Sequence, residues 1–101
     1  MARDPGKGVA EGVNPTAEHE YWRKSYASRP YVTIGATYDE YGPAYQHGWE
    51  ARSRYPDKNF NDVENDLARD WERAKGKSNL KWETAKQASR DAWDRVGSGT
   101  H

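Results

Sequence analysis

Residues 38–96 read YDEYGPAYQHGWEARSRYPDKNFNDVENDLARDWERAKGKSNLKWETAKQASRDAWDRV. An aromatic residue recurs in this stretch every 22 positions, and a tryptophan follows each one eleven positions later. The leading residues are Tyr38, Phe60 and Trp82, and the tryptophans that follow them are Trp49, Trp71 and Trp93. A fixed period of this kind predicts one structural unit repeated three times.

Each unit has the period of an amphipathic α-helix. At about 100° per residue, the leading aromatic and the third, seventh and eleventh positions after it lie within an arc of about 80°. No unit shows the period of two that a half-buried strand requires. Ser89 is the one polar residue in the apolar set. The predicted core therefore consists of Tyr38, Tyr41, Tyr45, Trp49, Phe60, Val63, Leu67, Trp71, Trp82, Ala85 and Trp93.

Capping residues and a proline mark the expected helix starts. Thr37 followed by Glu40 has the spacing of a capping box, and Asn59 holds the same place one unit later. Pro43 lacks a backbone donor and disfavours helical geometry at the residue before it. We therefore expect the first of the three helices to begin at Pro43, with residues 38–41 forming a separate turn whose aromatic rings still reach the core.

Short links between the units favour antiparallel neighbours, so the predicted fold is all-α: a small up-down-up three-helix bundle of 22-residue repeats over residues 38–96. An open solenoid is the alternative. For residues 14–37 we expect a short helix that starts at Asn14 and Pro15, followed by an extended linker packed on the bundle. Residues 1–13 are expected to form a disordered tail, and residues 97–101 a flexible one.

Length and composition bound the class of protein. A chain of 101 residues supports one small domain. The absence of cysteine excludes disulfides and thiolate metal sites and fits a reducing compartment. The sequence shows neither an apolar run of the roughly 18 residues needed for a membrane span nor an N-terminal secretory signal. We expect a soluble, cytoplasmic protein.

Charge is zero overall but is unevenly distributed along the chain. Residues 1–37 carry a net charge of +1, residues 38–68 carry −4, and residues 69–101 carry +3. An acidic middle and a basic end can attract each other within one molecule or between two copies. Self-association is therefore open, whereas a dedicated nucleic-acid binder usually has a clear basic excess.

Several short motifs place the chain beside a known group of proteins. They are YWR at 21–23, SRPY at 28–31, YQHGWEAR at 45–52, DWE at 70–72 and DAWD at 91–94. This set resembles a group of uncharacterised bacterial proteins with repeated aromatic-to-Trp helical segments, some of which accompany general-stress domains. The resemblance covers residues 20–96 and implies a stress-associated bacterial protein, with no catalytic residues to transfer. The group's pattern has proline at the positions of Asn65 and Gln87, where this chain departs from it.

Signals for chemistry are weak. His47 precedes Glu50 by three residues and could share a metal or a proton with it on one helix face, but no second histidine or cysteine lies nearby in sequence. An exposed structural role for His47 is the simpler interpretation, and His19 has the same weakness. The chain contains no phosphate loop, no serine nucleophile elbow and no metal motif. We therefore expect no enzyme activity, no cofactor and no metal.

Alternating arginine and aromatic residues give the stronger binding signal, because guanidinium groups over rings can hold an anion or stack on a base. The same contacts can also fix a linker to a bundle. The candidate binding residues are Tyr26, Arg29, Tyr31, Arg52, Arg54 and Tyr55. We expect a non-enzymatic interaction or stress-associated protein whose partner is another protein or a second copy. The alternative is a weak nucleic-acid or polyanion binder that uses the basic C-terminal third.

Overall fold

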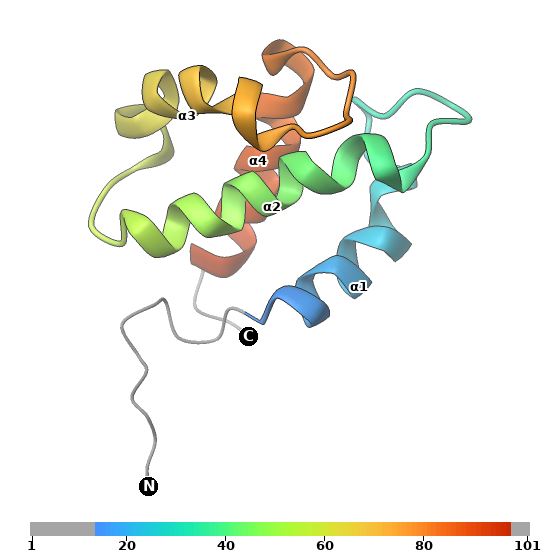
Figure 1. Cartoon of the computed structure of the whole chain (residues 1–101). Coiled ribbons are helices and arrows are strands. Elements are labelled where there is room, and N and C mark those ends of the chain that lie inside the picture. Colours follow the sequence, from blue (N-terminus) through green and yellow to red (C-terminus); the bar gives the residue numbers. More distant parts are fainter. Residues whose placement is uncertain (1–13, 98–101) are drawn as a thin grey trace, which may run out of the picture.

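The computed structural model describes residues 14–97 and forms one helical body (Figure 1). Its elements are α1 (Pro15–Ser25), a short 3₁₀ helix (Tyr26–Ser28), α2 (Tyr38–Arg54), α3 (Phe60–Ala74) and α4 (Trp82–Gly97). The described part contains no strand, so the all-α prediction is confirmed. The predicted tails lie outside the described residues, except Gly97, which is the last residue of α4.

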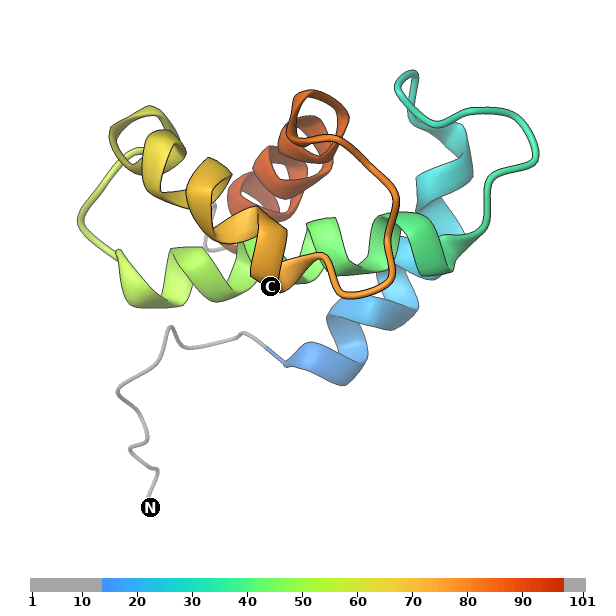
Figure 2. The same cartoon turned by 45° about the horizontal axis from the view of Figure 1, so that its top comes forward.

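Three of the helices begin at the three leading aromatic residues of the sequence pattern, Tyr38, Phe60 and Trp82. Figures 1 and 2 show α2 through the middle of the molecule, with α1 on one side of it, α3 on another and α4 crossing it. The contact between α2 and α4 is the most extensive, and α2 also contacts α1 and α3. Helix α2 is therefore the central element of the fold.

The expectation that the first of these helices begins at Pro43 is wrong. Helix α2 runs unbroken from Tyr38 and holds Pro43 in its sixth position. The proline removes the bond that the carbonyl of Asp39 would accept, but Asp39 is exposed, so water can replace that bond. Gly42 has no Cβ to crowd the proline ring, and the ring of Tyr38 fills the space beside it.

The predicted capping box at Thr37 is also absent, because Thr37 makes no side-chain cap bond. Glu40, its expected partner, instead accepts a hydrogen bond from the backbone N of Asn79 at 2.8 Å, while its carbonyl accepts one from Ser78 Oγ at 2.7 Å. The first turn of α2 therefore fixes the loop between α3 and α4. At the next unit, Asn59 is the N-cap of α3 as expected.

The linker between α1 and α2 consists of two turns rather than an extended segment. The backbone N of Val32 donates to Arg29 O, and that of Ala36 donates to Thr33 O. The second turn needs a positive φ, which Gly35 supplies at 89°. Hydrogen-bonded turns replace the predicted extended chain because this glycine lets the backbone reverse, and Figure 2 shows the linker as a loop at one end of the molecule. At Asn14 and Pro15 the helix start is as predicted: Asn14 caps α1 and accepts from Ala17 N.

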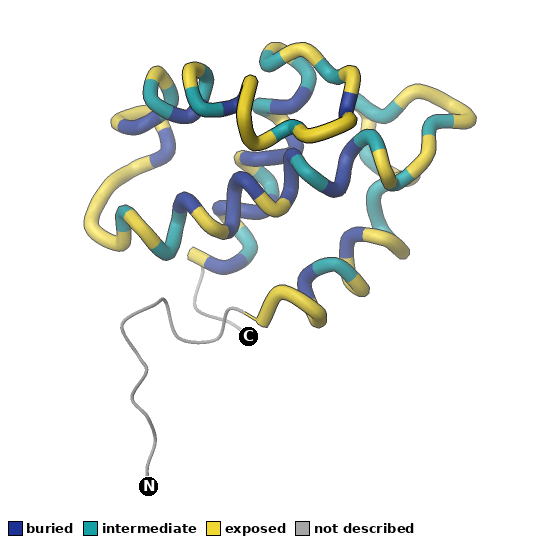
Figure 3. Tube along the Cα trace, viewed as in Figure 1, coloured by how far each residue is buried: buried dark blue, intermediate teal, exposed yellow. Residues whose placement is uncertain are grey.

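The core forms two adjoining clusters of buried side chains. One gathers around α1, the first half of α2 and α4, and the other joins the end of α2 to Phe60, Leu67 and Trp93. Figure 3 shows buried positions concentrated along α2 and on α4 behind it. Tyr38 and Trp82 are half-buried, and the other residues of the predicted core are buried. The core also includes residues that the pattern omitted: Trp22, Ala44, Ala51, Ala88, Ala92 and Val96.

Helices α2 and α4 meet at backbone distance. A Cβ atom built on Gly48 would lie 2.1 Å from the carbonyl oxygen of Ser89, so no larger residue fits there without moving a helix. Ser89 is fully buried, and its Oγ donates to the carbonyl of Ala44 at 2.7 Å. The one polar residue of the sequence pattern is thus a hydrogen-bonded contact at the closest approach of two helices.

Candidate functional site

Tyr31, one of the candidate binding residues of the linker, takes part in a half-buried chain of hydrogen bonds. The hydroxyl of Tyr31 donates to Asp91 Oδ2 at 2.6 Å and lies 2.9 Å from the hydroxyl of Tyr45. Because Tyr31 gives its only hydroxyl hydrogen to Asp91, the Tyr45 hydroxyl is the donor in the second bond. The chain of bonds ties α2, the linker and α4 together.

Arg29 and Trp22 complete this cluster. The indole of Trp22 stacks on the ring of Tyr45 with centroids 4.2 Å apart and planes 8° from parallel. The guanidinium of Arg29 lies 5.2 Å above the Trp22 ring, and its Nε is 3.6 Å from Asp91 Oδ2. Arginine and aromatic side chains therefore do meet here, with the rings facing inward.

Tyr26, the third linker candidate, holds the linker against itself. Its hydroxyl donates to the carbonyl of Ala36 at 3.0 Å, which closes the segment between α1 and α2. Its ring packs against Tyr38 at 5.4 Å and Tyr41 at 6.1 Å. The hydroxyl and the ring of Tyr26 therefore both hold the linker and α2 in place.

Burial sets the protonation state of these hydroxyls. It raises the pKa of Tyr45 to about 12 and raises the pKa of Tyr31 further, with the hydrogen bond to Asp91 adding to the effect at Tyr31. Burial also raises the pKa of Tyr38. All three phenols remain protonated near neutral pH, and those of Tyr31 and Tyr45 act as hydrogen-bond donors.

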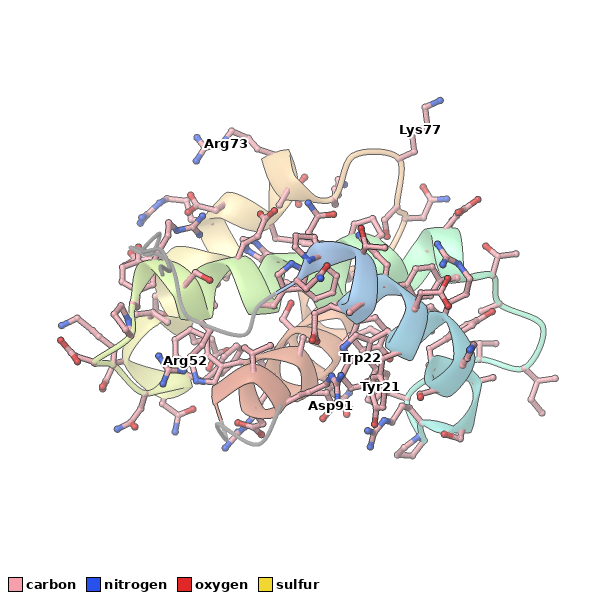
Figure 4. All side chains as sticks on the ribbon, turned by 90° about the horizontal axis from the view of Figure 1, so that it is seen from below. Tyr21, Trp22, Arg52, Arg73, Lys77 and Asp91 are labelled. Carbon is pink, nitrogen blue, oxygen red and sulfur yellow. The ribbon has the colours of Figure 1, made fainter. Side chains whose placement is uncertain are left out.

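The other three candidates lie at the opposite end of α2. Arg52 donates to the carbonyl of Pro56 at 2.8 Å and lies 5.8 Å above the ring of Trp93, while Arg54 lies over the ring of Tyr55. Figure 4 shows Arg52 well apart from Trp22 and Asp91. The six predicted binding residues therefore form two separate groups and no single site.

His47 is buried, so the expectation that it is exposed is wrong. Its Nε2 lies 3.0 Å from the carbonyl of Leu67, to which it donates, and its ring is 5.9 Å from both Trp71 and Trp82. Burial lowers the pKa of His47, which keeps the ring neutral. His47 joins α2 to α3, while Glu50 is exposed and accepts from Gln46.

His19 also has a fixed partner, although the sequence suggested none. Its Nδ1 shares a hydrogen bond with the hydroxyl of Tyr38 at 3.0 Å, and its ring meets Trp49 edge-on at 4.7 Å. Burial, followed by the charge of Arg23, lowers the pKa of His19. Both histidines within residues 14–97 serve helix packing, and no group of three or more metal-ligating side chains occurs in that range.

Sequence reasoning missed one buried ion pair. Glu18 is only 2% exposed, and its Oε1 accepts from Arg95 Nε at 3.0 Å, joining the first and last helices across 77 positions. The guanidinium of Arg95 also lies 3.8 Å from the centre of the Tyr21 ring. The Glu18 position follows the N-cap Asn14 by four residues, but nothing in the sequence indicates its distant partner.

Most of the basic side chains of the C-terminal third are close to acids. Arg69 pairs with Asp66 on the same helix at 2.9 Å, and Lys86 pairs with Glu64 of α3 at 3.1 Å. Arg73 pairs with Asp70 at 2.8 Å. In Figure 4, Arg73 and Lys77 project outward on the same side of the molecule.

Two grooves flank the outer face of α2. The larger, of about 610 Å³, lies between α2 and the loop that follows α3, and the smaller, of about 270 Å³, lies between α2 and α1. Asp39, Pro43 and Gln46 line both grooves. This stretch of α2 is therefore a ridge with a depression on each side, which we call the α2 ridge.

No helix of the described part of the chain combines the length and the apolar character that crossing a membrane requires. Comparisons of the chain with protein-family models, with curated proteins and with solved structures give no match.

Proposed function

We propose that this chain is a small helical interaction protein that performs no chemistry of its own and takes part in a bacterial stress response. The observation that carries the proposal is the bond from His47 Nε2 to the Leu67 carbonyl. The imidazole of His47 could in principle act in catalysis, but this bond uses it to hold α2 against α3. The same use of polar groups in packing recurs at His19 with Tyr38 and at Tyr31 with Asp91. The stress association rests on the sequence resemblance alone.

The α2 ridge is the face that we assign to a partner protein. It belongs to the central helix, and the two grooves beside it can receive side chains from a second molecule. The larger groove is lined by three acids, Asp39, Glu40 and Glu50, and by two lysines, Lys75 and Lys77. One negative charge is left in excess, and Asp39 and Glu50 are exposed, so a partner segment with a basic residue fits the ridge best. A second copy of the chain could occupy the ridge instead, so the experiment must distinguish a dimer from a complex with another protein.

Affinity capture tests this assignment. Three proteins are immobilised and exposed to lysate of stressed cells of the native host. They are the full chain, its Gln46→Arg variant on the ridge, and an Arg73→Gln control outside both grooves. We expect one protein to be retained by the parent chain and the control and lost with Gln46→Arg, and a sedimentation run to show the purified chain as a monomer.

If the Gln46→Arg variant retains the partner protein as well as the parent chain does, the assignment of the binding face to α2 is wrong. Sedimentation as a dimer that Gln46→Arg dissociates would replace the partner protein with a second copy. The proposal of a non-enzymatic protein fails if the purified chain turns over a substrate and loses that activity on one polar substitution while still folded.

A polyanion-binding function is the second candidate. The observation that favours it is the common direction of Arg73 and Lys77 at the end of α3 (Figure 4). Binding to mixed-sequence DNA or RNA that weakens steeply as salt rises would support it. Absence of binding at low salt would exclude it. The acids beside Arg69, Arg73 and Lys86 make this the weaker proposal.

We further propose that α2, α3 and α4 are three copies of one 22-residue unit arranged up, down and up, in a cytoplasmic protein. Support comes from the shared helix starts and from the burial of Trp49, Trp71 and Trp93. The copies differ in their surroundings, since Trp93 packs with Phe60 whereas Trp49 and Trp71 share the other cluster. Exchanging the exposed residues of one unit for those of another, with the fold retained, would test the equivalence.

A further inference from the structure

A groove of about 450 Å³ lies on a different face from the α2 ridge. Its walls are the linker at residues 29–31, the first turns of α3 and the outward side of α4. It shares no lining residue with the two grooves beside α2. Its volume is within the range of small-molecule sites, about 300–1,000 Å³.

Charged side chains from three segments meet in this groove. Arg29 comes from the linker, Lys86 and Arg90 from α4, and the acids are Glu64 of α3 and Asp91 of α4. Three positive and two negative groups leave one positive charge in excess. A groove with this balance attracts a ligand that carries a single negative group.

Each of the two acids in the groove lies beside a basic side chain, so the excess positive charge belongs to the remaining basic residue. Lys86 Nζ is 3.1 Å from Glu64 Oε2, and Arg29 Nε is 3.6 Å from Asp91 Oδ2. Arg90 is exposed and makes no side-chain hydrogen bond or ion pair with another of the described residues; its guanidinium lies over the ring of Phe60, 5.9 Å from the ring centroid. Arg90 therefore offers an uncompensated guanidinium at the groove.

The guanidinium of Arg29 also has a hydrogen-bond donor without an acceptor among the described residues. Its Nε is buried and has no hydrogen-bond partner within the described part of the chain, because Asp91 Oδ2 is 3.6 Å away, slightly too distant for a hydrogen bond. The side chain as a whole is 36% exposed, so the end of the guanidinium reaches the groove. Two guanidinium groups with spare donors thus line one depression.

We propose that this groove binds one oxyanion, a carboxylate or a phosphate monoester, carried on a compact apolar body. Guanidinium forks match both oxyanions in bidentate geometry, and Arg29 and Arg90 would supply them. Pro30 and the rings of Tyr31 and Phe60 provide apolar wall for the remainder of the ligand. The site does not depend on the proposed partner protein, because it lies away from the α2 ridge.

Nuclear magnetic resonance titration of the full ¹⁵N-labelled chain at low ionic strength tests the site. The probes are benzoate and phenyl phosphate, with benzamide as the neutral counterpart and inorganic phosphate as the anion without an apolar body. We expect saturable shifts confined to residues 29–31, 60–64 and 86–91 with benzoate or phenyl phosphate, and much weaker binding of benzamide and inorganic phosphate. The stronger of the two organic anions identifies the oxyanion.

Two variants sharpen the test. Arg90→Gln should weaken binding about tenfold, because it removes the charge-assisted contact. Arg73→Gln, a change at another exposed arginine, on α3 outside the groove, should leave binding unchanged. Equal weakening by both variants, shifts spread over all basic residues, or no saturable shifts up to about 10 mM of either organic anion would overturn the proposal. If Arg90→Gln unfolds, the location of the shifts in the parent chain decides alone.

Discussion

Tyr31 and Asp91 join the linker to α4 through a hydrogen bond of 2.6 Å between residues 60 positions apart. The bond is the shortest link in a chain that continues to Tyr45 and, through the stacked ring of Trp22, to α1. It converts an irregular segment into a fixed part of the fold. It also places Asp91 at the edge of the groove that contains Arg29 and Arg90.

Replacing Tyr31 with phenylalanine should lower the free energy of unfolding by about 1–2 kcal/mol, because Asp91 loses a half-buried donor while the ring stays. Urea denaturation of both proteins measures the difference. Tyr55→Phe is the matched control, since the Tyr55 hydroxyl makes no hydrogen bond among residues 14–97, and it should change stability by less than about 0.5 kcal/mol. Equal effects of the two substitutions would show that the Tyr31 bond contributes nothing.

The pair of Glu18 and Arg95 should stabilise the contact between the first and last helices. Glu18→Gln keeps the shape of the buried side chain but removes its charge, and we expect a loss of about 1–3 kcal/mol. Glu20→Gln on the same helix is the control, because the pair of Glu20 and Lys24 is largely exposed, and it should cost less than about 0.5 kcal/mol. Thermal unfolding compares them, and a larger loss from Glu20→Gln would contradict the assignment.

His47 should make stability depend on pH. Its pKa is lowered on folding, so the unfolded chain binds the proton more readily, and folding is favoured above the unfolded pKa of about 6.5. Stability from this residue is lost as the pH falls from about 6.5 towards the lowered folded value. His47→Gln can still donate to the Leu67 carbonyl but cannot titrate. Urea midpoints at pH 7.5 and 5.5 should therefore differ less in the variant, and an unchanged difference would exclude His47 as the source.

Trp71→Ala should cost about 3–5 kcal/mol, because it removes a fully buried indole at the end of α3. The structure adds a second loss: Trp71 Nε1 donates to the carbonyl of Leu80 at 2.9 Å and so fixes the loop before α4. Trp71→Phe helps to distinguish the two effects, since it keeps a buried aromatic ring but loses the bond together with part of the indole's volume. Calorimetric unfolding should rank the parent chain above Trp71→Phe and that variant above Trp71→Ala. A different order would contradict the packing.

The sequence predicted the start of α3 because Asn59 precedes a regular apolar period. It failed on α2, where a periodic rule looks for one apolar face. His47 lies about 180° from Tyr38 around the helix axis and is nevertheless buried, because α2 has neighbours on three sides. The residues that face α4, Ala44 and Gly48, are small and so carry little apolar signal.

The candidate site was only partly predictable for a related reason. Arg29 and Tyr31 lie close together in sequence, so their proximity could be inferred, but Asp91 is brought to them by the packing of α4. Glu18 and Arg95 likewise meet only after the whole chain has folded. Pairing between distant charges has no local signal in a single sequence.

The backbone contact between Gly48 of α2 and Ser89 of α4 sets how closely the two helices with the most extensive contact can pack. Glycine to alanine inside a helix normally gains about 0.5–1 kcal/mol, so the sign of the change is diagnostic. Gly48→Ala should instead cost about 3 kcal/mol, at the upper end of overpacking effects, because the new methyl meets the Ser89 backbone. Gly97→Ala at the end of α4 places its methyl against the movable end of the Arg52 side chain and should cost far less. Urea unfolding of the two variants distinguishes the outcomes: a large loss of stability confined to Gly48→Ala is expected, and a neutral or stabilising Gly48→Ala would show that the Gly48–Ser89 contact does not determine the packing of α2 and α4.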